Sequence, residues 1–365
     1  MTIKVQKMIL PSTKEVYWTV LGEDDLPIAP IREYLAYCRN HMSPNTIKTY
    51  AYHVKLYWEY LEKEKVEWPN VTIHDLADFM TWLRRGGDMR IIPFGHEMAK
   101  RQKSTVNATL SAVKCFYDYQ YNQGADVKLN LLKSTGHQRK FTKFLEHVSK
   151  KKTSDRNILN YRLPKKRKPT LTAEEMKKIM ESCHTLRDKL IIAILADTGM
   201  RIGQVLGLRH EDIQTFDNAI KIIPRENNKN GARSKSIDEN IVTITKETTS
   251  LYRKYLEYEF GDYPSDYVFI NLWHHPKGEP MTYEGVRTLV RRIQKDTGIK
   301  FHLHMFRHTV ATGMRKLGIR NDLVAAALGH RSPETTDAIY NHPDPQDIRK
   351  AMANYHQERN DSASK

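Results

Sequence analysis

Apolar residues recur at three- and four-residue spacing through the first third of the chain, and this period predicts amphipathic helices. Ser43, followed by a proline, suits the start of one helix, Thr72 begins a capping box, and Ser104 can cap a third helix. Four residues in front of them, Ile31, Tyr34, Leu35 and Cys38, indicate one more helix. Together these patterns predict a bundle of about four helices over residues 28–125. The predicted inner faces of the three capped helices contain Ile47, Tyr50, Val54, Tyr57, Trp58, Leu61, Leu76, Phe79, Met80, Leu83, Val106, Leu110, Val113 and Tyr117.

The second half of the chain combines helical and strand patterns. Thr172 begins another capping box, and a strongly apolar helix is predicted around residues 190–195. β-branched runs at residues 219–224 and 241–245 flank a polar loop and predict a hairpin with a long insertion. Helical spacing returns from about residue 247. The chain is therefore predicted to be mainly α with a small β-hairpin or sheet, an α+β protein.

The charge of the chain indicates what kind of partner it binds. A chain of 365 residues is long enough for two domains with separate cores. Its net charge of +16 implies an anionic partner, and nucleic acid is favoured because no lipidation motif or long basic amphipathic helix is evident. Residues 133–169 alone contain thirteen Lys and Arg and two acidic residues. Such a run can be a solvated linker or a nuclear-localisation tract, but its place between two folded segments favours contact with DNA.

The sequence shows neither a membrane-spanning segment nor a disulfide framework. The chain has no run of about eighteen apolar residues, and its N-terminus lacks the continuous apolar core of a signal peptide. Cys38, Cys115 and Cys183 are far apart and show neither metal-ligand spacing nor a disulfide framework. We expect no membrane partner, and a cytoplasmic, nucleoid-associated bacterial protein.

Two arginines, two histidines and a tyrosine are the candidate catalytic residues of the chain: Arg201, His304, Arg307, His330 and Tyr340. An arginine fork can bind two phosphate oxygens and stays charged, a histidine can move a proton or donate a hydrogen bond, and a tyrosine can attack phosphorus. Each residue alone is more often structural. Jointly, and in this order, they indicate DNA strand breakage through a covalent phosphotyrosine.

The segments around these residues resemble the tyrosine recombinases, the phage integrase family. The sequence TGMR, which ends at Arg201, resembles the first box of the family, and residues 304–308 resemble the second, H-x-x-R-H. His330 in L-G-H and Tyr340 in I-Y-N-H resemble the third. The resemblance covers about residues 170–345, and the S-x-N-T-I start of the bundle is similar to the core-binding domain of the family. Within the family the chain looks most like the transposase A group of site-specific transposons.

The resemblance implies a mechanism and partners. Arg201, Arg307, His304 and His330 would hold the scissile phosphate of double-stranded DNA, and Tyr340 would form a 3′-phosphotyrosyl link without cofactor or metal. A homotetramer on DNA would then exchange strands to integrate or excise a mobile element, with accessory transposition proteins as further partners. The family also uses a hairpin lysine that is a proposed acid for the leaving oxygen. The pattern selects Lys235, and Lys229 remains the alternative.

Five segments follow from pattern and resemblance together. Residues 1–27 form an N-terminal extension, residues 28–130 the helical core-binding (SAM-like) domain, and residues 131–169 a basic linker. Residues 170–345 form the catalytic tyrosine recombinase domain, and residues 346–365 a C-terminal helix and tail, which can dock on a neighbour or pack on its own chain.

Two departures from the family pattern stand out. The residue three positions after Arg201 is usually acidic, yet here it is Gln204, which can only hydrogen-bond, so it is left outside the catalytic set. His330 and Tyr340 are ten residues apart where nine is usual. The pair beginning at His274 lacks further acidic ligands, so a zinc site is not favoured.

Three other readings are kept open by the same residues. A type IB topoisomerase shares the chemistry but relaxes supercoils without a defined site. A DNA-binding regulator with a decayed site would bind DNA without forming an adduct. A replication-initiating endonuclease would need a metal and would leave a 5′ link.

Overall fold

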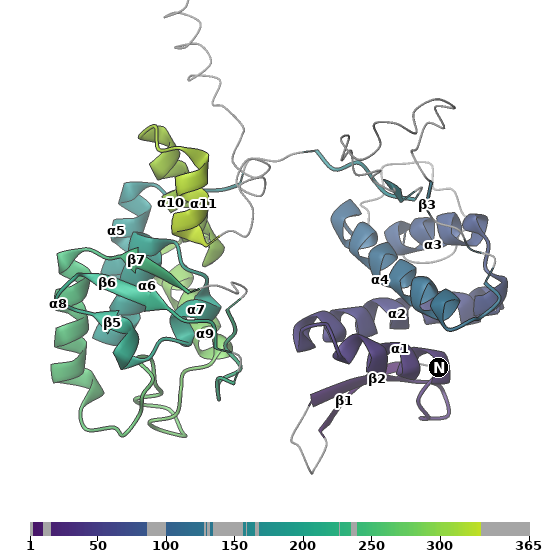
Figure 1. Ribbon diagram of the computed structural model, residues 1–365, viewed down its shortest axis with the longest axis horizontal. Helices are drawn as coiled ribbons and strands as arrows, with labels where there is room; N and C mark the ends of the chain where they lie inside the picture. Colours follow the sequence, from purple (N-terminus) through teal and green to yellow (C-terminus); the bar gives the residue numbers. More distant parts are fainter. Residues whose placement is uncertain are drawn as a thin grey trace, which may run out of the picture. The chain divides into compact units, whose positions relative to one another are not determined.

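The computed structural model describes residues 3–9, 16–85, 100–127, 129, 132–133, 156–157, 159–164, 168–225, 227–234 and 239–329 (Figure 1). The chain divides into two compact units, residues 1–165 and residues 166–365. The predicted fold class is confirmed, because both units are mainly helical and carry only small sheets. Within the described residues, no helix is both long and apolar enough to cross a membrane.

The first unit is a helical bundle with a hairpin packed against it (Figure 1). The hairpin pairs its two strands antiparallel, with Val5 opposite Val20 and Lys7 opposite Trp18. A short 3₁₀ turn lies between the second and third helices. The elements are β1 (Lys4–Ile9), β2 (Val16–Leu21), α1 (Ala29–Arg39), α2 (Pro44–Glu64), η1 (Trp68–Asn70), α3 (Ile73–Arg85), α4 (Lys103–Asn122), β3 (Leu132–Lys133) and β4 (Arg156–Asn157).

Local sequence explains where these helices begin, with one exception. The Ser43 hydroxyl accepts a hydrogen bond from the backbone of Thr46, and Thr72 and Asp75 bond each other reciprocally as a capping box. The prediction that Ser104 caps α4 is wrong. That helix begins at Lys103 with Gln102 as N-cap, and no side chain caps it.

The core of the first unit is rich in aromatic residues. Tyr57, Phe79 and Phe116 are fully buried, and the hydroxyls of Tyr57 and Tyr117 lie 2.6 Å apart. Burial without a partner would be costly for a hydroxyl, so this pair satisfies both groups inside the bundle. Val20 of β2 is also fully buried, which joins the hairpin to the helices.

The second unit surrounds one central helix. α6 is buried on nearly every side, which its uninterrupted apolar sequence requires, and it contacts α5, α8 and α10. The sheet has the order β5-β6-β7 and lies over α6 (Figure 1). The predicted hairpin of β6 and β7 is confirmed, while the two-residue β5 was too short to be detected from its pattern.

The elements of the second unit are as follows. They are α5 (Ala173–Glu181), α6 (Leu186–Thr198), α7 (Ile202–Leu206), η2 (His210–Asp212), β5 (Ile213–Gln214), β6 (Ala219–Ile222), β7 (Asn240–Thr243), α8 (Lys246–Tyr255), the π-helical turn η3 (Leu256–Phe260), α9 (Tyr283–Thr297), α10 (His304–Lys316) and α11 (Asn321–Leu328).

Candidate active site

Three of the predicted site residues lie within the described part of the second unit. Arg201 is the N-cap of α7, His304 is the first residue of α10, and Arg307 lies one turn further along α10. The other three, Lys235, His330 and Tyr340, lie outside the described residues.

Gly199 makes the turn that leads into Arg201. It ends α6 in the left-handed region at φ 62°, which glycine adopts without strain. A Cβ atom at this position would lie 2.9 Å from Cδ2 of Leu328 and 3.3 Å from the Cα atom of Arg307. The ends of α6 and α11 and the first turn of α10 therefore approach one another as closely as a backbone without a side chain permits.

Arg307 joins these same ends through its guanidinium group. It is 1% exposed and is the largest of the fully buried side chains. Nη1 donates to the carbonyl of Gly199 at 3.0 Å, and Nη2 donates to the carbonyl of Leu328 at 2.6 Å. Carbonyls at helix C-termini carry partial negative charge, so they favour a cation there. One side chain thus holds the segment before Arg201 and the helix that ends two residues before His330.

His304 lies within electrostatic reach of both arginines. Burial lowers its pKa, and the positive charges of Arg307 and Arg201 lower it further. The imidazole of His304 is therefore neutral at pH 7 and can donate one hydrogen bond. It packs edge-on against the ring of His308, with 4.6 Å between ring centroids.

His308 is a buried neighbour of this group. Burial lowers its pKa to about 4, with the charges of His304 and Lys168 adding to the effect. On the same helix, the hydroxyl of Thr309 accepts a hydrogen bond from the backbone of Leu171 at 2.8 Å. This contact anchors the segment that follows Lys168 against α10, so a cation from the basic stretch lies near both histidines.

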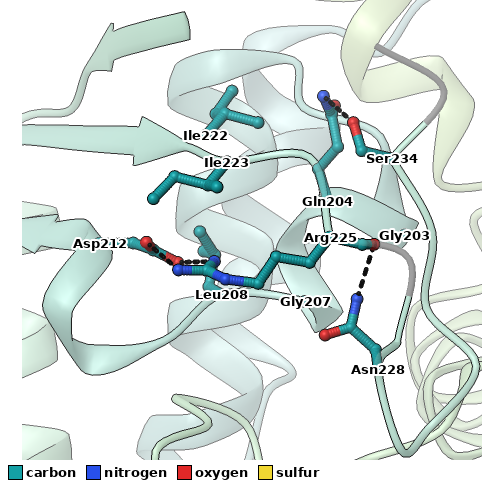
Figure 2. A pocket seen from close by; sticks show the side chains of 10 residues that line it. All are labelled: Gly203, Gln204, Gly207, Leu208, Asp212, Ile222, Ile223, Arg225, Asn228 and Ser234. Atoms are coloured by element: carbon teal, nitrogen blue, oxygen red, sulfur yellow. Dashed lines mark hydrogen bonds and ion pairs between the residues drawn. The ribbon is translucent and has the colours of Figure 1, made fainter. Parts of the chain in front are cut away.

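Gln204 has a role that the sequence did not show. It is 6% exposed, its Oε1 accepts from the backbone N–H of Arg201 at 2.9 Å, and its Nε2 donates to the hydroxyl of Ser234 at 3.4 Å (Figure 2). The R-x-x-Q spacing resembles a capping box and was the available signal. Because Ser234 immediately precedes Lys235 in sequence, Gln204 connects the Arg201 turn to the loop that leads to the predicted hairpin lysine.

The loop of residues 227–234 lies directly on α7. A Cβ atom at Gly203 would lie 2.5 Å from the carbonyl oxygen of Arg233, so only glycine permits this approach. Asn230 donates to the carbonyls of Leu206 and Met281, and the backbone N–H of Lys229 donates to the hydroxyl of Tyr267. The insertion between β6 and β7 is therefore fastened to the domain over these residues.

A small cavity beside Gln204 is bordered by a buried ion pair (Figure 2). Arg225 donates two hydrogen bonds to Asp212, at 2.7 and 2.9 Å, and one to Glu211 at 2.8 Å. These acids belong to the acidic segment that follows the first box. Asn228 donates to the carbonyl of Arg225 at 3.2 Å and so links the pair to the same loop. No three His, Cys, Asp or Glu side chains group as a possible metal site in the part of the chain that the structure describes.

Comparisons with known proteins cover both units of the chain. The model of the phage integrase family matches residues 169–347, and that of the phage integrase N-terminal SAM-like domain matches residues 31–124. Transposase A from transposon Tn554 of Staphylococcus aureus is 39% identical over 355 residues, which is 97% of this chain and 98% of that protein. This chain belongs to the phage integrase family. Tyrosine recombinase XerC of Staphylococcus carnosus is 23% identical over 332 residues, 88% of this chain and 95% of that protein.

Solved structures of other family members share the fold of this recombinase. The XerH site-specific recombinase in a post-cleavage complex with its difH substrate has a TM-score of 0.60 and 22% identity, covering 88% of this chain and 83% of that one. The Tn1549 transposon integrase with transposon right end DNA has a TM-score of 0.59 and 17% identity, covering 88% and 98%. The predicted family and enzyme class are confirmed: the chain is a tyrosine-type site-specific recombinase. The topoisomerase and regulator alternatives are not favoured.

Proposed function

We propose that this recombinase is the transposase of a mobile element, and that it cleaves and rejoins DNA strands through a 3′-phosphotyrosyl intermediate. The observation that carries the proposal is Arg307, whose buried guanidinium holds the ends of α6 and α11 beside Arg201 and His304. The near full-length similarity to a transposase supports it.

In this proposal four of the site residues bind the scissile phosphate. Arg201, Arg307 and His304, with His330, bind the non-bridging oxygens of the scissile phosphate and stabilise the charge of its pentacoordinate transition state. A neutral His304 suits this task because it donates a hydrogen bond without changing its charge near pH 7.

The nucleophile and the acid complete the reaction. The phenolic oxygen of Tyr340 forms a bond to phosphorus and loses its proton to a nearby base, while the bond from phosphorus to the 5′ oxygen breaks. Lys235 gives a proton to that oxygen, with Lys229 as the alternative. A 5′-hydroxyl of the partner strand then attacks the phosphotyrosine and reverses each step. The phosphodiester energy is kept in the covalent link, so strand joining needs no ATP.

Double-stranded DNA at the element ends and target site is the substrate. XerH, the Tn1549 integrase and the λ integrase were each solved bound to DNA, which supports this assignment. We assign DNA binding to residues 28–130, strand chemistry to residues 170–345, and contact along the duplex to the basic residues 131–169. Because lysines and arginines would supply most of the affinity, binding should weaken steeply with salt.

The assembly on DNA is a homotetramer in this proposal. The C-terminal segment, residues 346–365, would dock either on a neighbouring protomer or on its own chain. Accessory transposition proteins are further partners, and the reaction would take place on the nucleoid in the bacterial cytoplasm.

Covalent trapping tests the proposed chemistry. Nicked duplexes that span the ends of the element are incubated with wild type, Tyr340→Phe or the matched control Tyr258→Phe in the presence of EDTA, and then run on denaturing gels. Tyr258 is 69% exposed and lies outside the proposed site. We expect a 3′-linked adduct with wild type and the control, and none with Tyr340→Phe.

The other outcomes separate the alternatives. An adduct that survives Tyr340→Phe would show that another residue is the nucleophile. A native shift without any adduct would indicate a regulator, a 5′ link lost in EDTA would indicate a metal-dependent endonuclease, and relaxation of plasmids without a defined site would indicate a topoisomerase.

A further inference from the structure

The N-terminal hairpin of β1 and β2 is an addition to the two family domains. The SAM-like model begins at residue 31, after both strands have ended. The hairpin is nevertheless part of the fold, because Val20 is fully buried and Val5 and Trp18 pack against the core of the bundle. An element that packs against the bundle but lies outside the matched domains can therefore carry a contact of its own.

One end of the hairpin combines aromatic rings with exposed cations. Lys7 lies directly opposite Trp18 in the strand register, and the Nζ atom of Lys48 in α2 lies 5.1 Å from the centroid of the Trp18 ring. The ring of Tyr52 is tilted against Trp18 with 6.5 Å between centroids. Both lysines are exposed. One cation therefore lies over the indole, and a second comes from the residue opposite Trp18 in the register.

The neighbouring residue of β2 carries a similar pair. The guanidinium of Arg39, at the end of α1, lies 4.0 Å from the centroid of the Tyr17 ring. A cation–π contact at an exposed site is worth only about 0.5–1 kcal/mol, and it orients the cation without cancelling its charge. We name Lys7, Tyr17, Trp18, Arg39 and Lys48 the hairpin patch; because Tyr17 and Trp18 are consecutive in β2, its two cation–aromatic pairs lie on the two faces of that strand. Within the described residues, none of its three cations forms an ion pair with a carboxylate.

The opposite end of the hairpin is acidic. The turn after β2 exposes Glu23, Asp24 and Asp25, and Lys4 at that end pairs with Asp25 at 3.4 Å. Lys4 and Lys7 are three residues apart on one strand, about 10 Å, which is roughly one Debye length at 0.1 M salt. The hairpin is therefore polarised, with an excess of negative charge at one end and positive charge at the other.

We propose that the hairpin patch is an additional DNA-binding site that contacts the phosphate backbone of the duplex next to the segment bound by the bundle. Cations beside aromatic rings suit a polyanion whose bases or sugars can pack against the rings. The acidic end of the hairpin would have to point away from the duplex. The site would lengthen the footprint of each protomer and add affinity without reading sequence.

Charge decides between DNA and a second protein copy as the occupant. The chain carries +16, so a second copy would bring mostly like charge to a patch with three cations. A duplex brings one negative charge per about 1.7 Å of its axis. Lys48 belongs to α2 and Arg39 to α1, so the patch joins the hairpin to the bundle.

The salt dependence of binding tests the site with a matched pair of variants. Lys7→Gln and Lys4→Gln remove the same charge from exposed positions of the same strand, and neither residue is buried in the core. Full-length protein is titrated with a fluorescein-labelled mixed-sequence duplex between about 50 and 200 mM salt. We expect Lys7→Gln to lower the slope of log K against log salt by about one, and to weaken binding about five- to tenfold near 100 mM salt. Lys4→Gln should match wild type within about twofold.

The results that would overturn the site are distinct. Equal slopes for the two variants would remove the hairpin from the DNA interface. A Lys7→Gln protein with an unchanged slope and altered self-association in sedimentation would make the patch a protein contact instead. A wild type that binds duplex but forms no adduct would count against the phosphotyrosyl mechanism only, whereas a wild type that binds no duplex would overturn both.

Discussion

Two arginines of the catalytic unit, the buried Arg307 and the partly buried Arg225, have opposite surroundings. Arg307 is held by the carbonyls of Gly199 and Leu328, which carry no net charge. Arg225 is held by the carboxylates of Asp212 and Glu211, which raise its pKa and cancel its charge. We therefore assign Arg307 to phosphate chemistry and Arg225 to holding a loop. The two arginines thus differ in the kind of partner that holds them: backbone carbonyls orient the guanidinium of Arg307, whereas carboxylates form ion pairs with that of Arg225.

Replacing Arg307 should have the largest effect on catalysis. Arg307→Lys keeps the charge but loses the planar fork, so it cannot hold both carbonyls and a phosphate oxygen. We expect the single-turnover rate of adduct formation to fall about 10²- to 10³-fold, with DNA affinity changed much less.

Arg225→Lys is the matched control for that measurement. It should cut DNA at a rate within about fivefold of wild type under conditions where it is folded. Equal losses of rate in the two variants would mean that the contrast between the two arginines is not functional.

Breaking the Asp212–Arg225 pair should have the largest effect on stability. Asp212→Ala removes two of the three hydrogen bonds that the Arg225 guanidinium donates to carboxylates, and the Asp212 side chain is only 1% exposed. We expect the free energy of unfolding in urea to fall by roughly 3 kcal/mol, the low end for a buried pair because the Arg225 side chain is 21% exposed. A loss below about 1 kcal/mol would place this pair with surface ion pairs.

Acid should lower the free energy of unfolding through His308, the neighbour of Arg307. Its folded pKa of about 4 lies below the unfolded value near 6.5, so the unfolded state binds the proton first as pH falls. The contribution is constant above about pH 6.5 and is lost progressively between 6.5 and 4. Between pH 7 and pH 5 we expect wild type to lose roughly 2 kcal/mol more unfolding free energy than His308→Gln. Parallel pH profiles of the two proteins would contradict the assignment.

Gln204 lies between the two arginine regions, and its replacement should have the smallest effect. Gln204→Leu removes the bonds to Arg201 and Ser234 but keeps the volume. We expect adduct formation to slow about tenfold through misplacement of the loop, with unchanged affinity for a duplex. Gln204→Glu can still accept from the Arg201 backbone but cannot donate to Ser234, so it should recover part of the rate. No recovery, together with a loss of stability, would make Gln204 a packing residue only.

Much of the fold follows from local pattern, and the exceptions have physical reasons. The caps at Ser43, Thr72 and Thr172 are confirmed because each depends on residues within three positions. The prediction for Ser104 is wrong because a polar residue can lie within the first turn of a helix without capping it. β5 is two residues long and is defined by its pairing with β6, which no local period reveals.

The site divides in the same way. Arg201, His304 and Arg307 were selected by motif order and side-chain chemistry, and the structure locates them at the start of α7 and in the first turn of α10. Their catalytic roles, with those of Lys235, His330 and Tyr340, remain predictions. Gln204 was set aside because its chemistry is weak, and its importance is visible only through the partners it joins.

The sequence by itself determined most of the helices, the caps at Ser43, Thr72 and Thr172, the charge surplus and the family, because each is encoded within short segments or in composition. Only the tertiary structure decided which of the two arginines lies against backbone carbonyls and which against carboxylates. Arg307 bonds a residue 108 positions away, and Leu171 bonds one 138 positions away. Such contacts, and the burial that lowers the pKa of His308, arise when distant segments exclude water from one place, which no local pattern encodes.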